Sequence, residues 1–328
     1  MLFAGFLLAA SPAIVSAANP SLGGMSPRGG QRGAEVEVVF NGARLADAQE
    51  ILFYYPGIKV NEFAVVGDNQ VKTKLAITPD CRLGIHAVRI RTASGISDLK
   101  TFNVGALPEV PEVEPNNDFA APQKINLGVT VTGVVQNEDV DYFLVEAKQG
   151  ERITAEIEGI RLGATFFDPY VAILDLGRFE LSSSDDSALV WQDGVASIAA
   201  PKDGTYVIQV RETSFKGDGN SFYRLHVGRF PRPMATVPAG GKPGETVQVR
   251  WLGDVLGERA EPVTLPQQVT RAFGIFAQDA HGIAPSPNAF RISDLGNVVE
   301  VEPNNAAAEA TPFAAPMALN GVIGQPGD

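Results

Sequence analysis

Apolar and polar residues alternate along much of the chain, and this pattern predicts short β-strands. Near its start, Val36, Val38 and Phe40 alternate with Glu35 and Glu37. Successive residues of a strand point to opposite faces, so such a segment buries one face and leaves the other in water. Helical periodicity is nearly absent. Further strands are expected at residues 51–55, 71–77 and 86–92, separated by Gly, Asn and Asp.

The middle of the chain continues the pattern and predicts a second sandwich. Tyr206, Ile208 and Val210 form one apolar face of a strand. The Gly- and Asp-rich residues 216–220 are expected to join the last two strands as a hairpin. Strands are expected at residues 129–135, 140–147, 152–157, 170–175, 195–199, 206–211 and 222–227. This set of short strands favours a jelly-roll sandwich.

Strand pattern and composition together divide the chain into six segments. We expect a signal peptide at residues 1–18, an immunoglobulin-like sandwich at 19–105 and a proline-spaced acidic linker at 106–111. A jelly-roll sandwich is expected at 112–229, a smaller immunoglobulin-like domain at 230–299 and the truncated start of a second jelly-roll repeat at 300–328. The predicted fold class is therefore all-β, built from tandem β-sandwiches.

An internal repeat supports the last of these boundaries. The hexapeptide Glu-Val-Glu-Pro-Asn-Asn occurs at residues 112–117 and again at residues 300–305. The two copies continue in parallel without a gap, as far as residues 133–135 and 321–323. Self-similarity of this kind marks the start of a repeated module. We expect the second module to be cut off about one strand after it begins.

The charge balance excludes some classes of partner. The chain has 26 basic and 38 acidic residues, a net charge of -12, and would repel phosphate groups. Nucleic acid and anionic lipid are therefore not expected partners, whereas cations are. The single cysteine, Cys81, cannot form an intrachain disulfide and is expected to be a small packed side chain.

The first residues are typical of an export signal. Residues 2–10 are almost wholly apolar, and the small residues of 15–18 offer a cleavage site. The usual basic start is missing, since no Lys or Arg precedes Arg28. The alternative is a buried first strand or helix. This signal predicts a secreted, periplasmic or cell-surface protein. No other stretch is long and apolar enough to span a membrane.

Acidic and amide residues cluster at the start of the middle module. The proline after Glu114 favours an extended chain, in which Glu112, Glu114 and Asn116 share one face. The loop before the next predicted strand adds Asp139 and Asp141. Calcium takes six to eight oxygen ligands from such groups. From spacing alone, a calcium site and a solvated acidic linker followed by an Asp-rich turn remain open.

Residues 112–227 resemble the pre-peptidase C-terminal domain, a β-sandwich found beside secreted bacterial proteases and in collagenase collagen-binding modules. The motifs that carry the resemblance are Glu-Pro-Asn-Asn at 114–117, Asp-Val-Asp-Tyr-Phe at 139–143, Gly-Glu at 150–151, Asp-Asp at 185–186, Asp-Gly-Thr-Tyr at 203–206 and Tyr-Arg-Leu at 223–225. They cover about a third of the chain in a fixed order. The flanking sandwiches resemble those of large exported multi-domain proteins of planctomycete type.

The resemblance also implies a ligand set. Collagenase members of this family bind calcium through the acidic segment before the sandwich and an Asp pair before the next strand. The implied structural calcium ligands here are Glu112, Glu114, Asn116, Asn117, Asp139 and Asp141. At Asn117 the family often has a carboxylate, so a weaker ion site is implied. The loop at Asp185 and Asp186 is a further ion candidate, although an exposed turn is favoured.

Catalytic motifs are absent from the sequence. The three histidines, His86, His226 and His281, lie on predicted strands or in a turn. There is no Gly-x-Ser-x-Gly elbow and no His-Glu-x-x-His motif. We therefore expect this chain not to be an enzyme, while a catalytic domain beyond Asp328 stays open.

The leading functional hypothesis is an exported, non-catalytic protein whose calcium-binding module serves attachment, spacing or maturation of a larger surface or secreted protein. Its expected partners are other domains of the same protein and extracellular protein or polysaccharide. The alternative is an accessory, substrate-binding region of a secreted peptidase or other hydrolase. A third possibility is glycan or matrix-protein binding in its own right, for which exposed aromatic residues such as Phe215 and Tyr223 are candidates.

Overall fold

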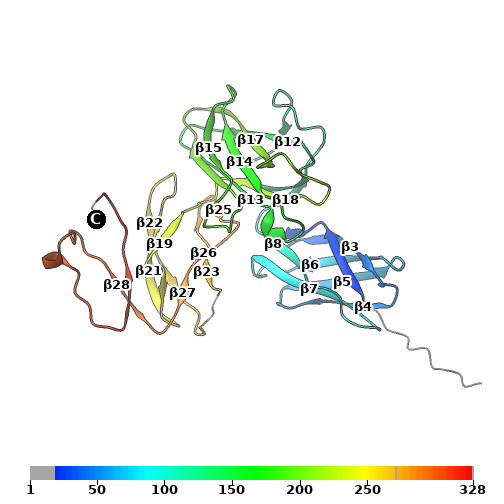
Figure 1. Cartoon of the computed structure of the whole chain (residues 1–328), viewed down its shortest axis with the longest axis horizontal. Coiled ribbons are helices and arrows are strands. Elements are labelled where there is room, and N and C mark those ends of the chain that lie inside the picture. Colours follow the sequence, from blue (N-terminus) through cyan, green and yellow to red (C-terminus); the bar gives the residue numbers. More distant parts are fainter. Residues whose placement is uncertain (1–18, 270–271, 327–328) are drawn as a thin grey trace, which may run out of the picture.

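In the computed structural model, residues 19–269 and 272–326 are described, and they fold almost wholly into β-strands (Figure 1). The all-β prediction with tandem sandwiches is confirmed. The two short helices in this part of the chain are 3-10 turns, η1 (Ile160–Leu162) and η2 (Ala307–Glu309). Figure 1 shows the central sandwich at the apex, with the first and third domains on either side below it. The expected signal peptide lies outside the described residues.

The first domain is a sandwich of two four-stranded sheets. Their orders are β1-β3-β6-β5 and β2-β8-β7-β4. The inward positions of the predicted alternation, such as Val38 and Phe40, are fully buried in the core between the sheets. The strands are β1 (Ser21–Ser26), β2 (Gly29–Gln31), β3 (Glu35–Ala43), β4 (Ala48–Phe53), β5 (Ile58–Val65), β6 (Gln70–Ile77), β7 (Gly84–Thr92) and β8 (Lys100–Gly105).

The central domain is a sandwich of two five-stranded sheets, β10-β12-β17-β14-β15 and β16-β13-β18-β11-β9. The alternate residues Tyr206, Ile208 and Val210 all point into its core. Its first strand, β9, forms within the segment expected as a linker and pairs in parallel with β11. The strands are β9 (Glu109–Pro111), β10 (Gln123–Lys124), β11 (Val129–Val134), β12 (Val140–Ala147), β13 (Arg152–Glu158), β14 (Pro169–Leu174), β15 (Glu180–Ser184), β16 (Val195–Ala199), β17 (Gly204–Glu212) and β18 (Phe222–Gly228).

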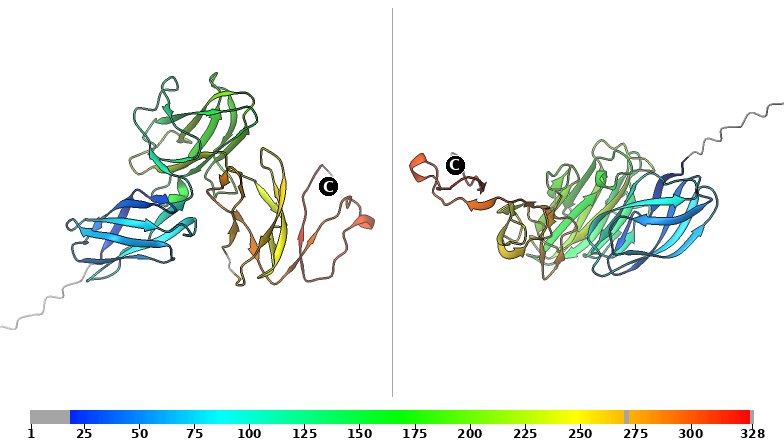
Figure 2. Two further views of the ribbon diagram at one scale, coloured as in Figure 1. Left: turned by 180° about the vertical axis from the view of Figure 1, so that it is seen from behind. Right: turned by 90° about the horizontal axis from the view of Figure 1, so that it is seen from below.

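The third domain is smaller and less regular, with one three-stranded sheet, β19-β21-β22, and three two-stranded pairs. Trp251 and Phe290 lie in its core. A final parallel pair, β28 with β29, follows it and extends away from the three sandwiches (Figure 2). The strands are β19 (Ala235–Val237), β20 (Gly240–Gly241), β21 (Thr246–Leu252), β22 (Arg259–Thr264), β23 (Gly274–Ile275), β24 (Gln278–Asp279), β25 (Gly282–Ile283), β26 (Asn288–Ala289), β27 (Arg291–Ile292), β28 (Gly296–Val299) and β29 (Met317–Asn320).

The first and third domains each contain a short strand with a glycine that lies close to a neighbouring parallel strand. In the first domain, β2 runs parallel to β8 with Gly29 opposite Asn103. In the third, β20 runs parallel to β27 with Gly240 opposite Arg291. A Cβ at either glycine would collide with the carbonyl oxygen of its partner strand. The hexapeptide repeat follows each of these glycine-bearing domains.

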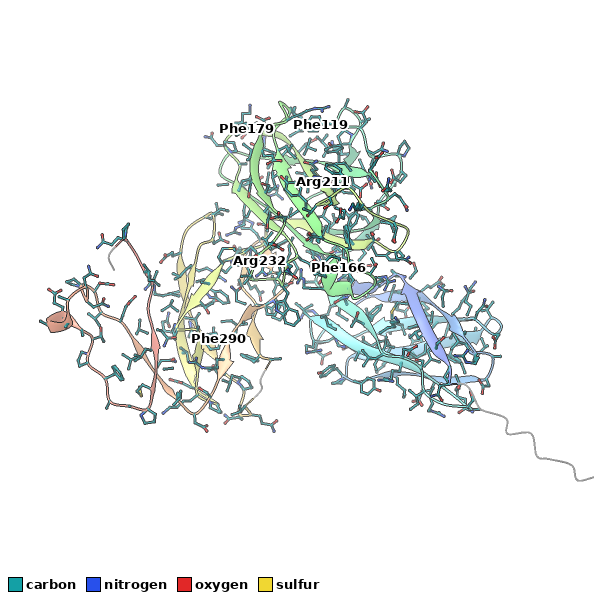
Figure 3. All side chains as sticks on the ribbon, viewed as in Figure 1. Phe119, Phe166, Phe179, Arg211, Arg232 and Phe290 are labelled. Atoms are coloured by element: carbon teal, nitrogen blue, oxygen red, sulfur yellow. The ribbon has the colours of Figure 1, made fainter. Side chains whose placement is uncertain are left out.

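A buried ion-pair network joins the central and third domains. Glu156 of β13 has no exposed side-chain surface, and its carboxylate lies 2.6 Å from the Nε of Arg232, which is equally buried. Arg232 is labelled in Figure 3, where the two domains meet. Arg161 of η1 lies 3.2 Å from the same carboxylate and donates to the Ser286 hydroxyl at 2.6 Å. Burial alone would raise the pKa of Glu156, but the two guanidinium groups outweigh it and lower that pKa.

The first and central domains meet around a buried arginine and the η1 turn. Arg224 of β18 lies 2.6 Å from both Glu109 and Glu158, and it packs against Gly29 of the first domain. The carbonyl oxygen of Leu162 in η1 accepts a hydrogen bond from the Thr101 hydroxyl at 2.9 Å. The η1 turn therefore contacts both neighbouring domains, through Leu162 on one side and Arg161 on the other.

Glu158 should make the chain sensitive to acid. Its burial would raise its pKa, but the Arg224 guanidinium outweighs burial and lowers the pKa. Because the pKa of Glu158 is lower in the folded state, its carboxylate stabilises the protein at pH values above the unfolded-state pKa of about 4.3. This stabilisation is lost as the pH falls below about 4.3 toward the folded-state pKa. The Glu158→Gln variant lacks this contribution. Its deficit in unfolding free energy relative to wild type should be largest at pH 7 and shrink below pH 4, measured by urea unfolding. A deficit that does not change with pH would contradict this.

Candidate metal centre

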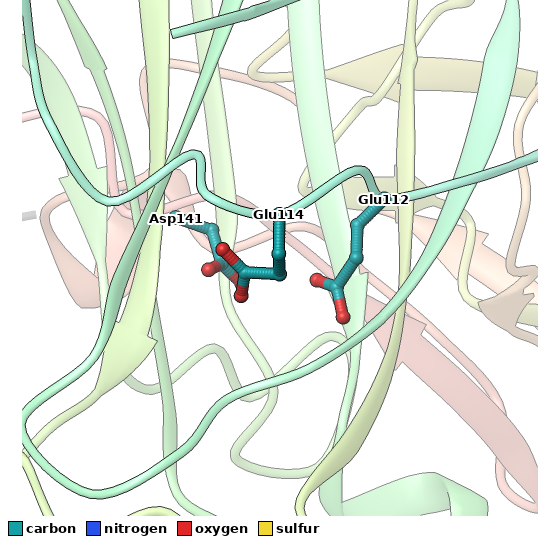
Figure 4. Close-up of side chains that lie close together, drawn as sticks. All are labelled: Glu112, Glu114 and Asp141. Carbon is teal, nitrogen blue, oxygen red and sulfur yellow. The ribbon is translucent and has the colours of Figure 1, made fainter. Parts of the chain in front are cut away.

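Three carboxylates converge where the chain enters the central sandwich. Glu112 and Glu114 follow β9 in an extended segment and point to the same side, as alternate residues must. Asp141 comes from the start of β12 and points inward from that strand. One ligand oxygen from each carboxylate lies within 4.8 Å of the other two. Figure 4 shows the three side chains facing one another. The predicted convergence of the acidic segment on the Asp-rich loop is present in the structure.

Two neighbours hold the Glu112 carboxylate in place. Its Oε1 accepts a hydrogen bond from the backbone N–H of Val134 at 2.8 Å. Its Oε2 accepts one from the Tyr223 hydroxyl, also at 2.8 Å. A Cβ at Gly133 would collide with this carboxylate and with the Tyr223 ring, so a glycine is required there. The carboxylate is therefore fixed against β11 before any ligand arrives.

Asp141 is the deepest member of the cluster. Its side chain is fully buried, and its Oδ2 lies 2.7 Å from the Tyr223 hydroxyl. Its Oδ1 is buried with no hydrogen-bond partner. The tyrosine has one hydroxyl hydrogen, so it can donate to Glu112 or to Asp141 but not to both at once. The pair of carboxylates therefore needs a further positive charge, from either a proton or a cation.

Electrostatics in the cluster favour such a cation. The pKa of Asp141 is raised to about 8, chiefly by burial and in addition by the nearby carboxylates of Glu112 and Asp139. Burial also raises the pKa of Glu112. The pKa of Tyr223 is raised well above its ordinary value by burial and by both carboxylates, so it stays a neutral donor. Repulsion between these acids is what a bound divalent cation would remove.

Asn116 offers a fourth oxygen. Its side chain is 1% exposed, and both its Oδ1 and its Nδ2 are buried without a partner. Its backbone N–H donates to the Glu114 carboxylate at 3.0 Å, and its carbonyl accepts from Tyr142 at 3.0 Å. A buried amide with no partner is costly unless something unseen satisfies it. The residues present therefore fit a metal ion bound by oxygen.

Besides Asn116, two further predicted ligands lie outside the three-carboxylate cluster. Asn117 is exposed. Asp139 is buried, but its Oδ2 accepts the backbone N–H of Gln136 at 3.1 Å. Sequence reasoning missed Tyr223 as part of this site and treated it as a candidate for an exposed aromatic face. That interpretation was wrong, because Tyr223 is 1% exposed. Its only sequence signal was its place on an alternating strand with an apolar inward face.

The second acidic loop has a different arrangement. Asp185 and Asp186 are exposed, and the Asp186 backbone N–H donates to the Asp185 carboxylate at 2.9 Å. Asp193 is turned away from them and accepts the backbone N–H groups of Gly159 and Ile160. Asp185 and Asp186 thus lie in an exposed bend that directly follows β15.

Two histidines, His86 and His226, each lie beside a thiol or a hydroxyl group, but both histidines are buried. The His226 Nδ1 lies 2.8 Å from the Thr130 hydroxyl, and its Nε2 lies 3.5 Å from Glu158, yet Thr130 and His226 are buried. His86 lies 3.7 Å from the Cys81 sulfur. Burial raises the pKa of the Cys81 thiol and lowers that of His86, so the thiol stays protonated. Both pairs are structural.

Comparisons with known proteins give distant likenesses. No family model matches the chain. A probable subtilase-type serine protease of Deinococcus radiodurans is 29% identical over 107 residues, which are 32% of this chain and 14% of that protein. The chain thus spans a small part of the length of this curated relative.

Among solved structures, the pre-peptidase C-terminal domain of a Bacillus anthracis collagenase matches 37% of this chain and 96% of its own, at 15% identity and a TM-score of 0.27. The secreted serine protease VesC of Vibrio cholerae matches 61% of this chain and 48% of its own, at 12% identity and a TM-score of 0.23. In the described part of the chain, no helix has the length and apolar character needed to cross a membrane.

Proposed function

We propose that the central domain binds a calcium ion through Glu112, Glu114 and Asp141, with the Oδ1 of Asn116 as a further ligand. The observation that carries the proposal is the convergence of the three carboxylates, one of which, Asp141, has a buried Oδ1 with no partner. The Oδ1 of Asn116, two residues after Glu114, is likewise buried without a partner. The donors are hard oxygens without nitrogen or sulfur, which suit calcium better than zinc or copper. The ion would hold the segment after β9 against β11 and β12.

Around this site we infer an exported, non-catalytic module that spaces or attaches parts of a larger protein. The apolar leader and the motifs shared with pre-peptidase C-terminal domains support export and an accessory role. A cation that fixes the entry segment of a sandwich would also fix the direction in which the chain arrives from the first domain. The ion's role is therefore structural, with stability rising as it binds.

A second candidate is the accessory region of a secreted peptidase. The segment shared with the subtilase-type protease of Deinococcus radiodurans supports this role. In that case the tandem sandwiches would place or guide a catalytic domain. The calcium site would serve the same structural purpose in both roles.

Calcium should stabilise the full chain against heat. At a free calcium concentration of about 100 times Kd, the expected gain is about 2.7 kcal/mol. For a domain of this size the gain raises Tm by roughly 5–10 °C. Differential scanning calorimetry in calcium, in magnesium and in chelator measures the shift, which should be larger in calcium than in magnesium.

The Asp185→Asn variant is the matched control, because it removes an exposed acidic charge from another loop. It should keep the whole calcium-dependent shift. Equal midpoints in calcium and in chelator for the wild-type chain would rule out the proposed site.

A further inference from the structure

The junction between the first and central domains contains a cavity of about 240 Å³. A water molecule takes up about 30 Å³ in the liquid, so the cavity has room for about eight waters or for one small ligand. The first domain supplies apolar walls at Met25 and Pro27, and the central domain supplies them at Leu162 and Phe222. A ligand in this cavity would therefore contact both domains.

Arg28 is the charged group that the first domain contributes to this cavity. It lies in the bend between β1 and β2 and is half-buried. Its guanidinium reaches across the junction, where the guanidinium carbon lies 4.4 Å from the centre of the Phe222 ring. On the side of the first domain it packs against Gly24, where a Cβ would lie 3.3 Å from its Nη2. The guanidinium is thus positioned by contacts with both domains.

The Arg28 guanidinium has no counter-ion. Within residues 19–269 and 272–326, no carboxylate pairs with it, and its Nε is buried without a hydrogen-bond partner. Removing a charge from water costs free energy unless an opposite charge or hydrogen bonds take the place of the water. Burial accordingly lowers the pKa of Arg28, and no nearby carboxylate offsets this effect.

Two other arginines at the domain junctions are paired with acids. Arg224 lines the same cavity, and its guanidinium lies 2.6 Å from each of two glutamate side chains. Arg152, between the central and third domains, lies 2.8 Å from Asp254. The lack of a partner at Arg28 departs from this arrangement and leaves its charge free for a ligand.

Glu112 also lines the cavity, but its carboxylate is engaged by other groups. Its two oxygens accept hydrogen bonds from the Val134 N–H and the Tyr223 hydroxyl, both at 2.8 Å. The proton or cation that Glu112 and Asp141 require also reduces the repulsion between Glu112 and an anion in the cavity. A ligand carboxylate can therefore supply the negative charge that Arg28 lacks.

We propose that this cavity binds a small organic acid whose carboxylate pairs with the Arg28 guanidinium. A guanidinium can donate two parallel hydrogen bonds to one carboxylate, which makes it selective for that group. The apolar part of the acid packs against Leu162 and Phe222, and its burial adds affinity that an inorganic anion would not gain.

Such a ligand would join the two domains. Arg28 belongs to the first domain, whereas Leu162 and Phe222 belong to the central one. A ligand that binds a site formed by both domains stabilises the arrangement in which they meet. The melting temperature of the full chain should therefore rise with the concentration of the acid.

Benzoate is a suitable probe, because it combines one carboxylate with a planar apolar ring. Titration of the full chain, followed by saturation-transfer-difference NMR, should show saturable binding with a Kd of about 1 mM or below. Binding is expected in chelator as well as in calcium, so its outcome is separate from that of the calcium proposal. Benzamide has nearly the same shape without the charge and should bind about tenfold or more weakly. Sulfate at the same concentration should not displace benzoate.

Three variants of the chain locate the binding. Arg28→Gln should weaken benzoate binding about tenfold or more, whereas Arg44→Gln, which removes an exposed guanidinium from the same domain, should leave the Kd unchanged. Thr132→Phe fills the cavity from β11 while keeping Arg28, and it should abolish binding. A melting profile recorded without benzoate checks that each variant is folded. Each of four results would overturn the proposal: no saturable binding, equal binding by wild type and Arg28→Gln, undiminished binding by Thr132→Phe, or displacement of benzoate by sulfate at equal concentration.

Discussion

Replacing Arg232 with methionine should lower the free energy of unfolding by about 3–5 kcal/mol. The Arg232 and Glu156 side chains have no exposed surface, and their charged atoms lie 2.6 Å apart. Methionine keeps most of the volume but leaves Glu156 buried with a single remaining cation, Arg161, at 3.2 Å. A buried carboxylate that loses a counter-ion must either stay charged at high cost or take up a proton.

Urea unfolding followed by circular dichroism measures this effect. Arg250→Met is the matched control, because Arg250 pairs with Glu258 at 3.1 Å on the surface, where both side chains are about half exposed. Such a surface pair contributes about 1 kcal/mol at most. A loss for Arg232→Met no larger than that of the control would show that the network does not hold the two domains together. Adding Glu156→Leu to Arg232→Met should recover part of the loss, since no unpaired charge then remains.

Replacing Asp141 with asparagine should remove the calcium response and stabilise the calcium-free chain. Asparagine has nearly the same shape but cannot supply a charged ligand at the deepest point of the site. The calcium-dependent gain, about 2.7 kcal/mol at 100 times Kd, should therefore be lost. In chelator the variant should melt above wild type, because burial and then the neighbouring carboxylates raise the pKa of Asp141, and asparagine has no charge to bury.

Calorimetry of both proteins, in calcium and in chelator, measures the two effects together. Glu138→Gln removes a neighbouring, exposed negative charge and serves as the control, which should keep the wild-type calcium response. If Asp141→Asn retained a full calcium shift, Asp141 would not be a ligand. If it also melted below wild type in chelator, the account of the electrostatics would be wrong.

Local pattern was enough to predict the strands and half of the site. The alternation of Tyr206, Ile208 and Val210 shows which face of a strand is buried, and this requires no knowledge of its neighbours. Likewise, Glu112 and Glu114 share a face because any extended chain places alternate residues together. The hairpin expected at residues 216–220 was wrong, because the strands on either side of it, β17 and β18, lie in different sheets and do not pair. The composition of a turn shows that the chain reverses there, but not which strands its two ends pair with.

Contacts between distant strands could not be predicted in this way. Tyr223 reaches Glu112 only because β18 and β11 are neighbours in the sheet, and the register of that pair is set by the whole sandwich. The charged residues Glu156, Arg161 and Arg232 look like ordinary surface residues in the sequence. Glu156 and Arg232 are buried and Arg161 is half-buried because a second domain covers β13, and no local pattern contains that information.

The close glycine contacts of the first and third domains could not be predicted for a related reason. The strands that carry these glycines are only two or three residues long, so they show no alternation. What the two domains share is the close approach of a glycine to a neighbouring backbone, at Gly29 and Gly240. Such a constraint becomes visible only when the partner strand is known.

The η1 turn has a mechanical consequence. Through Leu162 it is bonded to Thr101 of the first domain, and through Arg161 to Ser286 of the third. A rotation of the first or the third domain about the central sandwich would therefore strain the η1 turn. One short turn therefore restricts the orientation of both flanking domains relative to the central sandwich.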